Sequence, residues 1–222
     1  MNKPLVVMCN GPSLKEIDLD SLRGHDIIGM NAAYRYYYKN DFWPKYFGCF
    51  DYRVTNNHEG EYKKLIEDSP IERVFLLKKI SDSNKLTVLP LNGNIGDFSA
   101  SFQTFGYGGN TGVNCCQVGV CLGYKKIILI GADCKYKEVV TGASLEGNAL
   151  VMKETPPKNP NYFFDDYQRE GDKYNFPQAN LFHRPAWQAL SVFAKSQNVD
   201  IVNCTEESSL TCFRKNKIQL EL

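Results

Sequence analysis

The chain has 222 residues, and its 26 lysines and arginines nearly balance its 25 aspartates and glutamates. This balance argues against a protein that holds nucleic acid or anionic lipid mainly by charge, so we expect small molecules or neutral surfaces as partners. The length fits a single domain, residues 1–222, with a full hydrophobic core. We find no apolar run long enough for a membrane span or for the core of a signal peptide.

Eight cysteines are spread along the chain, most of them inside apolar segments, and none forms a Cys-x-x-Cys pair. This placement favours reduced, buried thiols in a cytoplasmic protein over a disulfide framework. A zinc site is the alternative, but the ligand spacing is unsuitable and the chain has three histidines. We therefore expect no metal and a cytoplasmic location. For the basic run 214–217, peripheral contact with the inner membrane face is the alternative to simple solubility.

Short, almost wholly apolar runs recur along the chain, with helical patterns between them. Such runs are typical of strands that are covered on both faces of a parallel sheet. They predict an α/β fold with one Rossmann-like, doubly wound, mostly parallel sheet and helices on both of its faces. The six runs are 5–8, 26–30, 46–50, 74–77, 126–131 and 200–203.

Two core helices are predicted in the second half of the chain. The first, residues 111–123, has apolar or small side chains on one face and a glycine at its C-terminal end. The small residues Cys115 and Gly119 would let this helix lie close to the sheet. The second, residues 184–198, has a proline in its first turn and an apolar stripe along one side.

Residues 134–182 differ in character from the rest of the chain. Glycines and prolines interrupt any long element there, and the stretch 161–167 is both aromatic and acidic. An insertion of this length in a compact domain is usually a functional lid or partly disordered. We predict a lid-like insertion within the single domain.

The first candidate site is the turn Asn10-Gly11-Pro12-Ser13, directly after the first predicted strand. Gly11 lets the backbone turn sharply, Pro12 makes the turn rigid and Ser13 can cap the helix that follows. Hydrogen-bond donors would then converge where an anionic ligand could sit. Judged from these residues alone, a capped turn without a ligand is an equally good interpretation, because the run is neither Gly-x-Gly-x-x-Gly nor a Walker loop.

Polar residues also follow other predicted strands. Asn31 ends the second and Asp51 the third, and ligands bind outside the carboxyl ends of the strands in doubly wound sheets. Both residue types also end strands by bonding to their own turns, which is the structural alternative. Asn110, Thr111 and Gly112 begin a predicted helix, where free backbone amides suit a carboxylate or phosphate unless Thr111 is merely a cap.

Three stretches carry more specific motifs: Asn-Gly-Pro-Ser-Leu within 10–18, the segment 111–127 with Gly-Tyr-Lys-Lys-Ile at its end, and Gly-Ala-Asp at 131–133. Together they resemble the bacterial sialyltransferases of glycosyltransferase family 42. They are also similar to a wider group that includes motility-associated transferases of nonulosonic acids to flagellin. The resemblance spans most of the chain and implies a nucleotide-binding, GT-A-like transferase fold.

The resemblance implies roles on the donor side of a transferase site. The turn at 10–13 would hold the phosphate and ribose, Asn31 would contact the cytidine nucleotide, and Thr111 with Gly112 would meet the donor carboxylate. Asp51 stands where the sialyltransferases have an asparagine, so a charge replaces an amide and the case for an identical donor weakens. The remaining donor-side residues that we select are Asn110 and Asp133.

The resemblance also implies the catalytic groups. His183, just before a predicted helix, matches the general base, and an imidazole that titrates near pH 6.5 can accept a proton from an acceptor hydroxyl. The family stabilises the departing phosphate with two tyrosines and no metal. Tyr136 is offset by one residue from the first position. Tyr162, Tyr167 or Tyr174 would supply the second, and we select Tyr162.

Three hypotheses follow. The leading one is an inverting glycosyltransferase that moves sialic acid or a related nonulosonic acid from a CMP-activated donor to an acceptor glycan hydroxyl, without a further cofactor or metal. The second is a nucleotide-dependent transferase or diphosphokinase of the wider group, favoured by Asp51 because a carboxylate can hold Mg²⁺ near phosphates. The third is a non-catalytic nucleotide- or glycan-binding module. The resemblance also leaves a homo-oligomer open.

Overall fold

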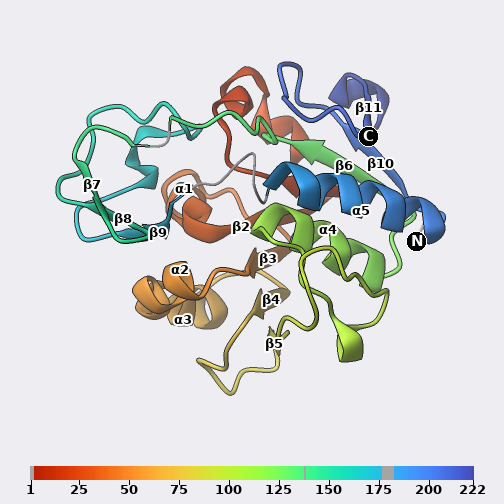
Figure 1. The fold of residues 1–222 in the computed structure, drawn as a ribbon, viewed down its shortest axis with the longest axis horizontal. Coiled ribbons are helices and arrows are strands. Elements are labelled where there is room, and N and C mark those ends of the chain that lie inside the picture. Colours follow the sequence, from red (N-terminus) through yellow and green to blue (C-terminus); the bar gives the residue numbers. More distant parts are fainter. Residues whose placement is uncertain (1–2, 138, 177–182) are drawn as a thin grey trace.

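The main sheet contains eight parallel strands in the order β11-β10-β6-β1-β2-β3-β4-β5 (Figure 1). The structure is a computed structural model that describes residues 3–137, 139–176 and 183–222. The parallel sheet with flanking helices confirms the Rossmann-like α/β fold. The strands are β1 (Leu5–Met8), β2 (Asp26–Met30), β3 (Tyr46–Cys49), β4 (Arg73–Leu76), β5 (Leu86–Val88), β6 (Lys126–Ile130), β10 (Asp200–Asn203) and β11 (Arg214–Lys215).

The six predicted strands are all present, and the two that the sequence did not indicate, β5 and β11, lie at the edges of the sheet. Edge strands are short and partly exposed, so they lack the apolar runs of the central strands. In β11 the guanidinium of Arg214 pairs with Asp200 (2.7 Å) and Glu221 (2.5 Å). The basic run is therefore partly neutralised within the fold, which weakens its interpretation as a membrane contact.

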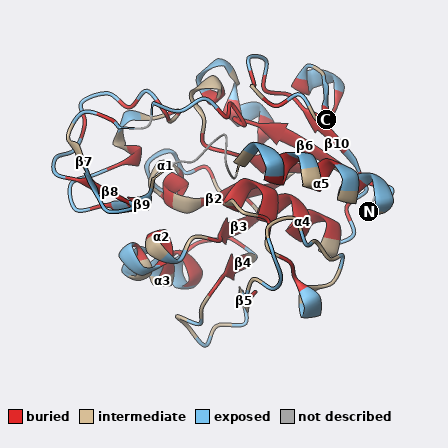
Figure 2. Cartoon of the chain, viewed as in Figure 1, coloured by how far each residue is buried: buried red, intermediate tan, exposed pale blue. Residues whose placement is uncertain are grey.

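Helices cover both faces of the sheet. On β1, Leu5 and Val7 belong to the core that contains α4 and α5, whereas Val6 and Met8 belong to the core beneath α1 and α3. Figure 2 shows the central strands and α4 buried, with exposed residues on the outer surfaces. The α-helices are α1 (Tyr34–Asn40), α2 (Tyr52–Asn57), α3 (Glu59–Asp68), α4 (Thr111–Cys121) and α5 (Arg184–Ser196).

Helix α4 is buried on every side, so the prediction of a single apolar face was too narrow. All residues from Thr111 to Val120 are buried. The predicted close approach to the sheet is confirmed at Gly119, where an added Cβ would lie 2.7 Å from Cδ2 of Leu5. The helix ends as predicted, with Gly123 in the left-handed region at φ +88°.

The predicted insertion contains a second, three-stranded antiparallel sheet of β7 (Ala143–Glu146), β8 (Ala149–Met152) and β9 (Lys173–Asn175). This sheet lies at one end of the molecule, near α1 (Figure 1). Leu150 and Met152 pack in the same core as Val6 and Met8 of β1. The described part of the insertion is therefore built into the domain. Residue 138 and residues 177–182 of the predicted lid lie outside the described residues.

All eight cysteines are free, and most of them are buried, as the sequence indicated. Among the residues that the structure describes, no group of three or more His, Cys, Asp or Glu side chains is arranged to hold a metal ion. None of the described helices is both long and apolar enough to cross a membrane.

The strand order fixes where a ligand can bind. From β1 the chain continues to β2 on one side, whereas from β6 it continues to β10 on the other. The neighbouring strands β1 and β6 therefore form a topological switch point, and the crevice outside their carboxyl ends is the expected ligand site of a doubly wound sheet.

Candidate functional site

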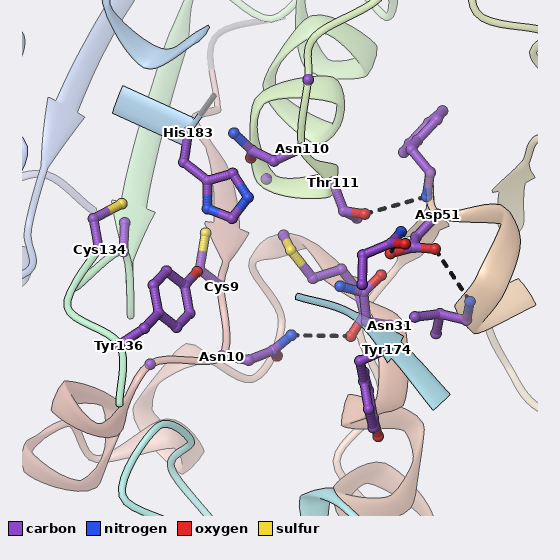
Figure 3. A pocket seen from close by; sticks show the side chains of 18 of the residues that line it. Cys9, Asn10, Asn31, Asp51, Asn110, Thr111, Cys134, Tyr136, Tyr174 and His183 are labelled. Atoms are coloured by element: carbon purple, nitrogen blue, oxygen red, sulfur yellow. Dashed lines mark hydrogen bonds between the residues drawn. The ribbon is translucent and has the colours of Figure 1, made fainter. Parts of the chain in front are cut away.

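A pocket of about 520 Å³ opens at this switch point. Its lining comes from the ends of β1, β2, β3 and β6, the start of α4, the insertion and the residue before α5. In Figure 3, His183 and Tyr136 lie on one side of the pocket, and Thr111 and Asp51 lie on the other. The predicted site residues that line it are Asn10, Gly11, Asn31, Asp51, Asn110, Thr111, Gly112, Asp133, Tyr136, Tyr162 and His183.

Pro12 and Ser13 do not line the pocket, in contrast to the prediction. The hydroxyl of Ser13 donates to Oδ2 of Asp133 (2.6 Å), and its backbone N–H donates to Oδ1 (3.2 Å). Ser13 also does not cap the following 3₁₀ helix, Pro12–Glu16, because it lies inside that helix and Gly11 precedes it. Ser13 therefore connects the turn after β1 to Asp133, which follows β6, without facing the pocket.

Gly11 is required at this turn for a steric reason. An added Cβ would lie 1.9 Å from Oδ2 of Asp133 and 2.6 Å from the carbonyl oxygen of Gly131. The Gly11 N–H donates to that same carbonyl at 2.9 Å. The loops after β1 and β6 are therefore in direct contact at the switch point, where only glycine allows such an approach.

Asn10 is almost fully buried, and its side-chain amide is held by two groups. Nδ2 donates to the carbonyl oxygen of Met30 (3.3 Å) and to the hydroxyl of Tyr167 (3.0 Å). Because a carbonyl can only accept, the NH₂ end of the amide must face Met30. The first strand-end amide is therefore joined to the end of β2 and to the insertion.

Asp51 is the N-cap of α2. Its Oδ1 accepts from the backbone N–H groups of Arg53 (2.8 Å) and Val54 (3.2 Å), and its Oδ2 accepts from Nδ2 of Asn175 in β9 (2.8 Å). The structural alternative raised by the sequence is thus realised, because an Asp at this position satisfies free amides of the helix. Through Asn175, the same carboxylate also connects the insertion to the end of β3.

The start of α4 forms another wall of the pocket. Oδ1 of Asn110 accepts from the N–H of Val113 (3.0 Å), so Asn110 and not Thr111 caps the helix. Oγ1 of Thr111 accepts from the N–H of Phe50 after β3 (3.3 Å), and the proton of that hydroxyl is not used in this bond. Trp187 closes the back of this wall, since an added Cβ on Gly112 would lie 2.9 Å from its ring.

Three amide atoms at the pocket have no hydrogen-bond partner among the described residues. They are Oδ1 of Asn10, Oδ1 of Asn31 and Nδ2 of Asn110, and all three are buried. Unpaired buried polar atoms cost about 1–3 kcal/mol each, so they concentrate where function requires them. Asn31 is additionally held in the left-handed region, at φ +55°. Such features are typical of ligand sites that bind polar groups, so this part of the pocket is the candidate site.

His183 and Tyr136 meet at the pocket, with ring centroids 5.7 Å apart in an edge-on arrangement. Burial lowers the pKa of the His183 imidazole from 6.5, so the ring is neutral at neutral pH and can accept a proton. The surrounding protein desolvates the hydroxyl of Tyr136 and raises its pKa well above 10, so that hydroxyl stays protonated and can donate. An acceptor of protons and a hydrogen-bond donor thus lie next to each other.

Tyr162 also lines the pocket and stacks on Tyr167, with ring centroids 3.7 Å apart and an interplanar angle of 13°. Sequence reasoning placed Tyr167 only among the lid tyrosines and did not mark Tyr52 or Trp187, which line the pocket too. The aromatic cluster at 161–167 was the available signal for Tyr167. No spacing rule identifies the other two, because tertiary packing brings them to the pocket.

The fold and the pocket define a Rossmann-like α/β domain with a polar ligand site at its topological switch point. No protein-family model matches the chain, and no curated protein matches it either. Solved structures that are similar to it include transferases.

The chain is similar to the sialyltransferase CstII of Campylobacter jejuni in complex with the substrate analogue CMP-3FNeuAc, with a TM-score of 0.55 and 18% identity over 99% of this chain and 88% of that one. A CST-II structure in complex with CMP gives a TM-score of 0.55 and 16% identity over the same shares. The MAf glycosyltransferase of Magnetospirillum magneticum AMB-1 gives 0.56 and 16% over 99% of this chain but 34% of that one. At these identities the likeness establishes a shared fold.

Proposed function

We propose that the protein is an inverting glycosyltransferase that moves sialic acid or a related nonulosonic acid from a CMP-activated donor to a hydroxyl of an acceptor glycan. The observation that carries the proposal is the meeting of His183 and Tyr136 in the same pocket as the strand-end amides. Its fold neighbours support it, since one is a sialyltransferase in complex with CMP-3FNeuAc and another is a glycosyltransferase.

The donor would lie across the switch point. Asn10 and Asn31 offer amides for the polar groups of a nucleotide, and the start of α4 suits an anion because helix N-termini favour negative charge. In our scheme the hydroxyl of Thr111, which accepts from Phe50, donates its proton to the same anion. In this scheme the fold already holds Asn10 and Asn110 in place before the donor binds, which lowers the ordering cost.

The proposed chemistry is a single displacement. The neutral imidazole of His183 accepts the proton of the acceptor hydroxyl as that oxygen bonds to the anomeric carbon. The bond from this carbon to the phosphate oxygen breaks, its electron pair stays on the phosphate, and CMP leaves with the configuration inverted. The protonated hydroxyl of Tyr136 donates to the departing phosphate and stabilises the charge that develops there.

Ligand binding and transfer test the proposal directly. CMP is expected to raise the melting temperature of the protein more than UDP, GDP or ATP at equal concentration, because at a given concentration the ligand with the lower Kd for the folded state stabilises it more. Incubation with CMP-sialic acid and glycan acceptors should then release CMP and form the glycoside. We expect both signals to persist in EDTA, since Asp51 serves as a helix cap in our scheme.

The possible results of this experiment separate the three hypotheses. Activity abolished by EDTA and restored by Mg²⁺ would instead favour the diphosphokinase-like alternative. Stabilisation by CMP without donor hydrolysis or transfer would favour a binding module. An equal response to all four nucleotides would contradict the proposed donor.

The pH dependence follows from the lowered pKa of His183. Burial favours the neutral imidazole, so the pKa of His183 lies below 6.5 and most of the base is unprotonated at pH 7. We expect the midpoint of the acidic limb of log(kcat/KM) for transfer to lie below pH 6.5. A midpoint above this value would contradict the assignment of this imidazole as the base.

A further inference from the structure

Tyr167 connects the insertion to both nucleotide-side loops. It ends the 3₁₀ helix Asp165–Tyr167 and is 1% exposed. Its hydroxyl accepts from Nδ2 of Asn10 (3.0 Å) at the end of β1 and from the N–H of Ala32 (3.4 Å), directly after Asn31 at the end of β2. One phenol oxygen of the insertion therefore holds two strand ends of the main sheet.

The backbone of the same segment reaches Asn10 as well. The N–H of Phe163 donates to the carbonyl oxygen of Asn10 at 3.2 Å. Asn10 is consequently fixed at both its main chain and its side chain by residues only four positions apart in the insertion. Together with the bond from Nδ2 to Met30, these contacts leave the amide of Asn10 one orientation.

Tyr167 itself is rigidly mounted. Its carbonyl oxygen accepts from Nη1 of Arg35 (2.7 Å) and from the hydroxyl of Tyr174 (3.3 Å). Arg35 forms a two-point ion pair with Asp172, at 2.5 and 2.9 Å, and both side chains are over nine-tenths buried. The single hydroxyl proton of Tyr174 is shared between the carbonyl of Tyr167 and Oδ2 of Asp172 (3.0 Å). Side chains from α1 and β9 thus hold the main chain of Tyr167 in place.

We propose that Tyr167 is a positioning residue for nucleotide binding, which orients Asn10 and the Asn31 loop through its hydroxyl. The inference rests on the proposed function in taking a nucleotide as the ligand of these loops. A site residue that is already held in its binding geometry spares the ligand the cost of ordering it. The insertion is then part of the nucleotide-binding apparatus, and its polar link to the strand ends contributes to affinity.

The test compares Tyr167→Phe with Tyr124→Phe. The first change keeps the ring that stacks on Tyr162 and removes the oxygen that Asn10 contacts. The second removes a buried hydroxyl that donates to Asp26 and does not line the pocket. Both variants lose one interior hydroxyl, so their melting temperatures report the general cost in stability of that loss. The ¹⁵N side-chain amide signals of Asn10 report the orientation of its side chain. These signals are assigned by their loss in Asn10→Asp.

In Tyr167→Phe we expect the Asn10 amide signals to shift and to exchange faster with solvent, and the Kd for CMP to rise about five- to tenfold. In Tyr124→Phe the Asn10 signals should stay in place. Unchanged Asn10 signals in Tyr167→Phe, or equal shifts in both variants, would overturn the inference. If the wild-type protein bound no CMP, the proposed function would fail, and the Asn10 signals alone would decide whether Tyr167 orients this residue.

Discussion

Replacing His183 with alanine is expected to lower the turnover number for glycosyl transfer by about 10²- to 10⁴-fold, the usual contribution of a positioned general base. The imidazole is neutral because of its burial and lies beside Tyr136 at the pocket. Without it, the acceptor hydroxyl must lose its proton to water. Steady-state kinetics with saturating donor and acceptor measure the loss, and the acidic limb of the pH profile should disappear with the side chain.

Two controls make this prediction specific. His25→Ala removes a histidine that does not line the pocket and should keep wild-type turnover. The His183→Ala protein should still be stabilised by CMP, because we assign donor binding to other residues. Turnover within threefold of wild type in His183→Ala would show that His183 is not the general base. Loss of CMP binding together with turnover would show that His183 acts mainly in holding the donor.

Replacing Asp172 with alanine is expected to lower the free energy of unfolding by about 3–5 kcal/mol, the usual effect of removing one partner of a buried ion pair. Arg35 would remain buried without its carboxylate, and the N–H of Arg169 and the hydroxyl of Tyr174 would lose an acceptor. For a domain of this size the melting temperature should fall by about 6–20 °C. Thermal and urea unfolding measure both quantities.

Asp166→Ala is the matched control for this change. Asp166 pairs with Arg169 at 2.5 Å, but the two side chains are 41% and 48% exposed. Such a surface pair contributes about 0–1 kcal/mol. Similar losses of stability in the Asp166 and Asp172 variants would mean that the Arg35 pair is no more important than a solvated one, and that the insertion is not anchored there.

The strands of the central sheet were predictable because each has a short apolar run with no polar face. Val6 and Met8 face one core and Leu5 and Val7 the other, so β1 has no polar face and reads as a buried parallel strand. The edge strand β11 was not predictable, since its Arg214 and Lys215 are exposed and paired with acidic or carbonyl groups. Edge strands carry little apolar signal because half of their surroundings are water.

The candidate site was predictable wherever a residue directly follows a strand. Asn10, Asn31 and Asp51 were selected by this rule, and the parallel sheet brings all three to one pocket. The predicted capping role of Ser13 was wrong, and no local pattern shows that its hydroxyl donates to Asp133, 120 positions away. Tyr167 was underestimated for the same reason, since its partner Asn10 lies 157 positions from it.

The central strands of the sheet, its core helices and the polar residues after several strands follow from local patterns, because hydrophobic period and turn chemistry encode these features. Long-range packing settles which way those polar groups point, which carboxylate is a helix cap and which tyrosine bonds to Asn10. These choices depend on hydrogen bonds between segments that are distant along the chain, and such bonds leave no periodic pattern in the sequence. The two rings of His183 and Tyr136 meet for the same reason, because strand order and the insertion bring them together.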